Sequence, residues 1–124
     1  MKDNNILPDG ELEIMQIVWQ CAPPVSRNTI EDMMNTDRHL APSTILTFLT
    51  RLCDRGFLHV ERQGRTNYYT PLVSRKDYLA GESRRMLNRL FGGSLSAFAV
   101  SLSDSGVSKE ELEELRKLLE EDSL

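Results

Sequence analysis

The sequence has few of the residues that form metal sites, disulfide frameworks or membrane spans. Its 124 residues include two cysteines and two histidines, and neither pair has the close spacing of metal ligands. Cys21 and Cys53 fall in or beside apolar helical patterns, which favours buried thiols. The apolar runs are too short to cross a bilayer, and the N-terminal segment lacks the apolar stretch of a signal peptide. We therefore expect a cytoplasmic protein with no membrane insertion, no metal and no other cofactor.

Groupings of side chains that support catalysis are also missing. We find no Ser/His/Asp grouping, no phosphate-binding glycine loop and no carboxylate pair in an apolar setting. Glu11 and Glu13 fall in the first turn of a predicted helix, where acidic side chains interact favourably with the helix dipole. The sequence therefore predicts a protein that is not an enzyme.

Acids outnumber bases overall, but charge is unevenly spread along the chain. The formal net charge is −4, which argues against indiscriminate binding of nucleic acid. Residues 40–72 nevertheless hold four arginines against two acids, whereas residues 109–124 hold seven acids against three bases. A local basic surface on an acidic chain is compatible with a specific, steered contact, and the acidic run predicts a solvated helix face.

Apolar periodicity predicts three helices in the first 56 residues. The first spans about Glu11–Ala22 and has Asp9 as its cap, the second follows Ser26 as N-cap, and the third spans Pro42–Arg55. Gly56 is expected to end the third helix. The residues expected to face the core are Leu12, Met15, Val18, Trp19, Ile30, Met33, Met34, Ile45, Phe48, Leu49 and Leu52.

A small β-hairpin is predicted directly after the third helix. FLHVER and TNYYT alternate as strands do, and QGR between them supplies the turn glycine. Three helices and a hairpin in this order predict a winged helix-turn-helix, in which the third helix enters the major groove and the hairpin reaches the adjacent backbone or minor groove.

The third helix and the hairpin tip carry the candidate DNA-binding residues. Thr44 and Thr47 suit base edges, and Ser43 at the helix N-terminus suits a phosphate. Arg51 is expected to bind a phosphate or, alternatively, to pair with Asp54 in solvent. Leu46 is expected either to contact a base or to pack. The full set is Ser43, Thr44, Leu46, Thr47, Arg51, Arg62 and Arg65.

Three further helices are predicted after Pro71. They follow a cap at Ser74, the segment SLSAFAVSL, and a capping box formed by Ser108 and Glu111. So short a segment rarely builds a sufficient core alone, so its apolar faces either fold back on the winged helix or, as we favour, pack against a second copy. The expected dimer-interface residues are Leu79, Met86, Leu87, Leu90, Phe91, Leu95, Phe98, Leu102, Leu112, Leu115, Leu118 and Leu119.

An ordered set of segments resembles the penicillinase-repressor family (BlaI/MecI/CopY type). The segments, from about Leu7 to Glu121, are LPDGELEIMQIVW, STILTFLTRLCDRGFL, YYTPL, GGSLSAF and SKEELEELRKLLEE. The resemblance implies a homodimer with interlocking C-terminal helices that represses from dyad operators with TACA/TGTA-like half-sites. It further implies control of β-lactam-resistance or metal-homeostasis genes, and induction through a membrane sensor-protease pathway.

The chain departs from the family pattern at several positions. No cysteine follows Cys53, so the C-terminal CxC pairs of the copper branch are missing. Val100-Ser101 or Ser101-Leu102, depending on the alignment, replaces the Asn-Phe bond that is cut in the β-lactam branch. Ser43 and Leu46 occupy positions that tend to be basic, and Pro8 occupies the cap position of the first helix. We therefore expect a different operator preference or affinity.

We expect a mainly α fold with a small β-hairpin (α+β), divided into a winged-helix DNA-binding domain (1–72) and a helical dimerisation domain (73–124). The expected function is transcriptional repression by a homodimer on double-stranded DNA. Two alternatives keep the winged helix: a MarR-like regulator that senses a small molecule, and a protein-interaction module without DNA binding.

Overall fold

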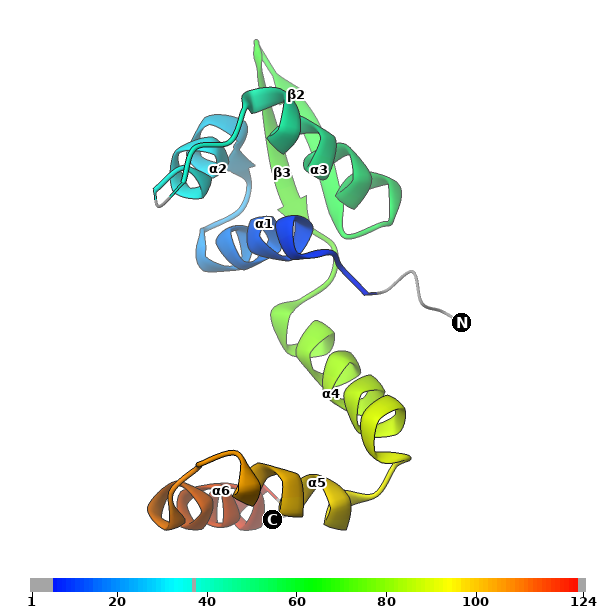
Figure 1. Cartoon of the computed structure of the whole chain (residues 1–124). Coiled ribbons are helices and arrows are strands. Elements are labelled where there is room, and N and C mark those ends of the chain that lie inside the picture. Colours follow the sequence, from blue (N-terminus) through cyan, green and yellow to red (C-terminus); the bar gives the residue numbers. More distant parts are fainter. Residues whose placement is uncertain (1–5, 37, 123–124) are drawn as a thin grey trace. The chain divides into compact units, whose positions relative to one another are not determined.

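The computed structural model describes residues 6–36 and 38–122 and divides into two compact units, Met1–Ala80 and Gly81–Leu124 (Figure 1). We refer to them as unit 1 and unit 2. The elements in chain order are α1 (Asp9–Gln20), β1 (Val25–Ser26), α2 (Arg27–Met34), α3 (Pro42–Asp54), β2 (Leu58–Gln63), β3 (Thr66–Pro71), α4 (Arg75–Phe91), α5 (Leu95–Asp104) and α6 (Lys109–Asp122).

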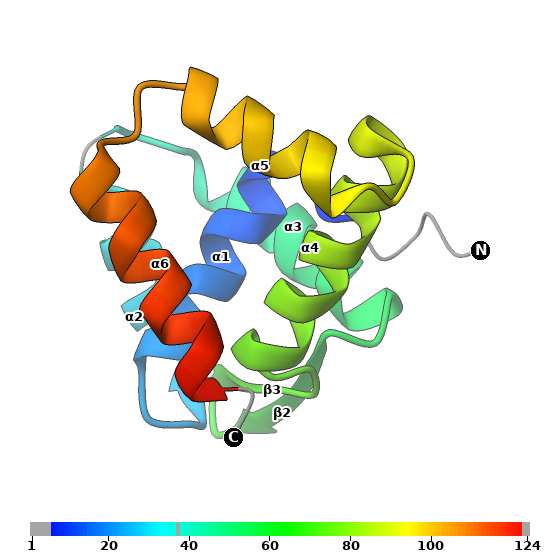
Figure 2. The ribbon, with the colours of Figure 1, turned by 90° about the horizontal axis from the view of Figure 1, so that it is seen from below.

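Unit 1 is a winged helix. Helix α1 packs against both α2 and α3 (Figure 2), and the three helices lie around the base of the β2–β3 hairpin, whose tip extends beyond them (Figure 1). Gly56 ends the α3 segment with a φ of 83°, a conformation that glycine adopts without strain. The predicted fold class, mainly α with a small β-hairpin, is confirmed.

The hairpin belongs to a three-stranded antiparallel sheet of order β1-β3-β2. Gln63 pairs with Thr66, so the turn consists of Gly64 and Arg65, and Gly64 has a φ of 65°. The short strand β1 was not predicted. It forms because Val25 and Ser26 pair with Tyr69 and Tyr68.

The core of unit 1 confirms most of the predicted apolar positions and corrects three details. Met33 is 38% exposed, so its predicted inward orientation is wrong, whereas Ile14 is fully buried. Helix α1 starts and ends two residues earlier than predicted. Asp9 is not its cap: Pro8 occupies that position without a side-chain hydrogen bond, and its carbonyl accepts from the Leu12 amide at 2.9 Å.

The first turn of α4 belongs to unit 1 because Tyr78 is anchored there. Its ring packs against Trp19 and Phe57 at centroid distances of 5.6 and 5.9 Å, and its hydroxyl accepts from the Leu7 amide at 3.3 Å. The Trp19 indole donates to the Val73 carbonyl at 2.9 Å. These contacts explain why unit 1 extends to Ala80, beyond the expected domain boundary at residue 72.

Unit 2 contains the rest of α4 together with α5 and α6, which are joined by a short loop (Figure 2). Ser94 caps α5 by accepting from the Ala97 amide at 3.0 Å. Ser108 and Glu111 exchange two hydrogen bonds of 2.9 and 3.1 Å, so the predicted capping box of α6 is confirmed. In the described ranges of the chain, no helix has the length and apolar character needed to cross a membrane.

Candidate nucleic-acid interface

Burial of one side of α3 determines which residues it presents to solvent. Ile45, Leu49 and Leu52 are fully buried. The 3.6-residue period therefore turns the opposite side outward. We call this the outer face of α3, and it consists of Ser43, Leu46, Thr47, Thr50 and Arg51, with Thr44 half-buried at its edge.

The beginning of α3 leaves the backbone amide of Ser43 outside the helical hydrogen bonds. Its N-cap residue, Ala41, makes no side-chain capping bond, and Pro42 at the first helical position has no N–H. The Thr44 amide bonds to the Ala41 carbonyl at 3.0 Å. The Ser43 amide precedes this first helical bond, so it lies, with the Ser43 hydroxyl, at an end of the helix that favours anions.

Thr47 is exposed on the outer face, but its hydroxyl proton is not available to a ligand. Its hydroxyl donates to the Ser43 carbonyl one turn earlier at 2.9 Å. The oxygen keeps acceptor capacity, but its proton is used within the helix. An apolar contact with a thymine methyl suits this arrangement better than hydroxyl donation to a base.

The hairpin tip presents two arginines in different ways. Arg62 folds back, donating from Nε to the Gly64 carbonyl at 3.1 Å, while Arg65 is an exposed turn residue. Both positions lie at the end of the wing, so the structure places the predicted wing residues together, separately from those on α3.

Arg51 lies at the edge of the outer face beside a carboxylate that sequence reasoning did not assign to the site. Its Nη1 atom lies 3.9 Å from Oε2 of Glu11, and Nη1 of Arg55 lies 3.6 Å from Oε1 of the same residue. The alternative partner Asp54 forms no ion pair with Arg51 among the described residues. Glu11 shares its helix face with buried Ile14, Met15 and Val18, and that spacing was the signal for its burial.

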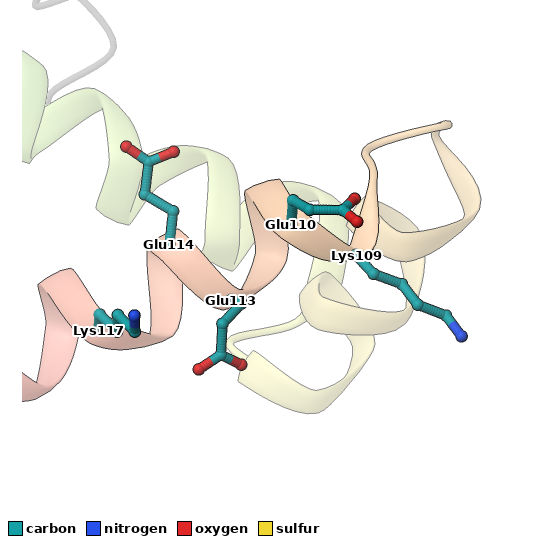
Figure 3. Close-up of a pocket in the computed structure, with 5 residues that line it drawn as sticks. All are labelled: Lys109, Glu110, Glu113, Glu114 and Lys117. Carbon is teal, nitrogen blue, oxygen red and sulfur yellow. The ribbon is translucent and has the colours of Figure 1, made fainter.

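Among residues 6–36 and 38–122, the remaining polar groups form no comparable site. Burial, together with the charge of Asp54, raises the pKa of the Cys53 thiol, which keeps it protonated and unreactive at neutral pH. Within the described ranges, no His, Cys, Asp or Glu cluster could hold a metal ion. The shallow hollow in Figure 3 is lined by Lys109, Glu110, Glu113, Glu114 and Lys117, all from the polar side of α6.

The fold and the outer face of α3 define a winged helix-turn-helix protein. Residues 7–121 match the family model described as Penicillinase repressor, and the chain therefore belongs to the penicillinase repressor family. It is 34% identical over 122 residues to the penicillinase repressor of Bacillus licheniformis, covering 98% of this chain and 94% of that protein. It is 27% identical over 114 residues to the methicillin resistance regulatory protein MecI of Staphylococcus aureus (strain N315), covering 91% and 92%.

Two solved structures resemble the chain in fold. The DNA-binding domain of the repressor BlaI matches with a TM-score of 0.54 and 32% identity, covering 63% of this chain and 94% of that one. The monomeric form of Bacillus licheniformis BlaI, in complex with the blaP half-operator, gives a TM-score of 0.51 at 32% identity with the same coverage. Since these relatives are repressors with a DNA-binding fold, the prediction that the chain is not an enzyme is confirmed.

Proposed function

We propose that the chain is a cytoplasmic, sequence-specific transcriptional repressor that binds a dyad operator with TACA/TGTA-like half-sites as a homodimer. The observation that carries the proposal is the outer face of α3, which combines small polar side chains with an arginine, on a helix that packs against strand β2 of the projecting wing. Family membership and the half-operator complex of a relative support it.

The residues of the outer face fall into two groups, those that suit phosphates and those that suit base edges. The Ser43 amide and hydroxyl and the Arg51 guanidinium suit phosphates, which fix the register of the helix. Thr44, Leu46 and Thr47 suit base edges, with the methyl of Thr47 and the exposed Leu46 side chain favouring thymine methyls. Arg62 and Arg65 on the wing would contact the neighbouring backbone or minor groove.

Exposed leucines on unit 2 support dimerisation. Leu90, Leu95, Leu115, Leu118 and Leu119 are exposed, and the rings of Phe91 and Phe98 pack edge-to-face at 5.5 Å. So much exposed apolar surface on a small helical unit favours burial against a second copy. The remaining interface candidates are Leu79, Met86, Leu87, Leu102 and Leu112, of which Leu87 is already buried within one chain.

Repression in this proposal consists of occlusion of a promoter by the bound dimer. A membrane sensor-protease pathway is the proposed route of induction, although the bond at the family's cleavage position is Val100-Ser101 or Ser101-Leu102 and not Asn-Phe. Recognition of that position must therefore differ if the repressor is cut in α5.

Fluorescence anisotropy tests the proposal directly. A labelled duplex from the region upstream of the protein's own gene is titrated at two salt concentrations and compared with a scrambled duplex. We expect nanomolar binding, two protomers per site and strong discrimination against the scrambled duplex. Weak binding that ignores sequence would contradict the repressor function, and a specific thermal shift with a small molecule would instead favour a MarR-like regulator.

A further inference from the structure

Glu11 is a buried acid that the contacts proposed so far do not use. Its side chain is 1% exposed, and both carboxylate oxygens are buried without a hydrogen-bond partner among the described residues. Burying a carboxylate is costly unless a cation or hydrogen-bond donors compensate it. The side chains that can compensate it are Arg51 and Arg55 of α3.

The sequence around Glu11 explains why its carboxylate is not used to cap α1. Glu11 is the third residue of the helix, from which a glutamate often reaches back to the N–H of the cap residue. Here the cap residue is Pro8, which has no N–H. Pro8 therefore removes the usual acceptor role and leaves the carboxylate facing the arginines.

Gly10 allows α1 to come close to α3 beside this carboxylate. A Cβ atom at Gly10 would lie 2.6 Å from Cε2 and 2.7 Å from Cζ of Phe48. Phe48, Arg51 and Arg55 occupy the same side of α3, because they are separated by three and four residues. The close approach at Gly10 thus brings the first turn of α1 to the side of α3 that carries both arginines.

The two arginines differ in how freely they can leave Glu11. The Arg55 side chain is 33% exposed, and it also donates to the Ile6 carbonyl at 3.1 Å. The Arg51 side chain is 59% exposed and lies at the edge of the outer face. We call these three residues the Glu11 triad, and its formal charge of +1 equals the charge needed to neutralise one phosphate.

We propose that Glu11 is a positioning residue for DNA binding, which orients Arg51 so that its guanidinium contacts the buried carboxylate along one edge and a backbone phosphate along the other. A guanidinium has five N–H donors in a rigid plane and can serve two anions together. Arg55 remains as the permanent counter-ion of Glu11. The proposal rests on DNA binding through α3, and it adds a residue that does not touch DNA.

A double-mutant cycle tests this coupling. Operator affinity is measured by anisotropy at one salt concentration for the wild type, Glu11→Gln, Arg51→Ala and the double variant. Loss of a charge-assisted contact predicts that Arg51→Ala weakens binding about tenfold or more in the wild type. We expect that factor to fall to about threefold or less in the Glu11→Gln background, because Arg51 is no longer oriented there.

Glu13→Gln is the matched control. Glu13 lies on the same helix and carries the same charge, but its partner is Arg38. In the Glu13→Gln background, Arg51→Ala should weaken operator binding by the same factor as in the wild type. If Arg51→Ala weakened operator binding in the Glu11→Gln background by the same factor as in the wild type or by a larger one, the positioning role would be overturned. Failure of the wild type to bind any operator would instead refute the proposed function.

Arg51→Lys provides a second test that leaves the buried residue intact. Lysine keeps the charge but is a compact point charge that lacks the planar two-edged donor set. We expect its operator affinity to lie within about threefold of Arg51→Ala. Wild-type affinity of Arg51→Lys would show that the site needs a single charge and no orientation by Glu11, and this outcome stands even if Glu11→Gln does not fold.

Discussion

Arg51 can be tested at the scale of a single residue through the salt dependence of binding. Replacing it with alanine should weaken binding of matched and mismatched duplexes about equally, because a phosphate contact carries no base identity. The slope of log affinity against log salt should flatten by roughly one. Anisotropy at several salt concentrations measures both effects. Lys117→Ala, which removes one charge from the polar side of α6, should leave the slope unchanged.

Substitutions at Thr47 test whether its methyl group or its hydroxyl contacts a base. Its hydroxyl proton is bonded to the Ser43 carbonyl, so the methyl is the group left for a base. Thr47→Ser, which removes the methyl, should weaken operator binding about fourfold, corresponding to about 0.8 kcal/mol for one buried carbon. Thr47→Val, which keeps it, should bind within about twofold of the wild type. If Thr47→Val lost more operator affinity than Thr47→Ser, the hydroxyl and not the methyl would be the group that contacts the base.

Prediction from sequence at this scale succeeded for surface residues and failed for a buried one. The solvent exposure of Ser43 and Arg51 follows from the helical period, which fixes the outer face once the core stripe is known. The acidic first turn indicates Glu11 as a dipole partner. Its spacing from Ile14, Met15 and Val18 is a sign of burial, but a local pattern cannot show which side chains from another helix approach its carboxylate. Its burial depends on the docking of α1 on α3, a contact between residues some 40 positions apart.

At the scale of elements, the structure makes a clear prediction about the docking of α1 on α3. Gly10→Ala should gain about 1 kcal/mol in helix propensity, but its methyl would collide with the Phe48 ring, at a typical cost of 1–3 kcal/mol. We expect a net decrease in thermal stability, measured by circular dichroism.

Gly81→Ala is the control for this experiment. Gly81 lies inside α4, and a Cβ added there meets nothing within 4 Å. The substitution should therefore stabilise the helix by about 0.5–1 kcal/mol. If Gly10→Ala raised the melting temperature as Gly81→Ala does, Phe48 would be moving aside freely and the close approach would not constrain the two helices.

Elements differed in how well the sequence predicted them. The hairpin and the capping box of α6 are encoded within a few residues, by alternation, by a turn glycine and by the Ser108–Glu111 pair. Strand β1 has no such local signal, because two residues become a strand only by pairing with Tyr68 and Tyr69. The early start of α1 likewise follows from Pro8, whose fixed φ of −58° makes it a cap without a side-chain acceptor.

At the scale of the whole molecule, the sequence predicted the order of elements and the family, because both depend on patterns along the chain. The same patterns cannot specify how two units or two chains associate, since an apolar stripe fits many partners. Leu90, Leu95 and Leu119 are exposed to solvent among the residues that the structure describes. Dimerisation therefore remains a prediction, which substitutions of exposed leucines in unit 2 can test.

Replacing Leu115 and Leu118 with aspartate should give a monomer, because two charges would have to be buried in the proposed interface. Light scattering after size-exclusion chromatography measures the mass, and Leu72→Asp, at an exposed leucine of unit 1, should remain dimeric.

Linking two half-site contacts typically raises affinity 10²–10⁴-fold. The affinity of the Leu115→Asp/Leu118→Asp variant for the full operator should therefore fall by that factor, while its affinity for a half-site duplex should equal that of the wild type. The half-site measurement shows whether the loss comes from the missing dimer or from repulsion between DNA and the two added carboxylates. Wild-type affinity for the full operator in a proven monomer would show that dimerisation is not what makes the repressor bind.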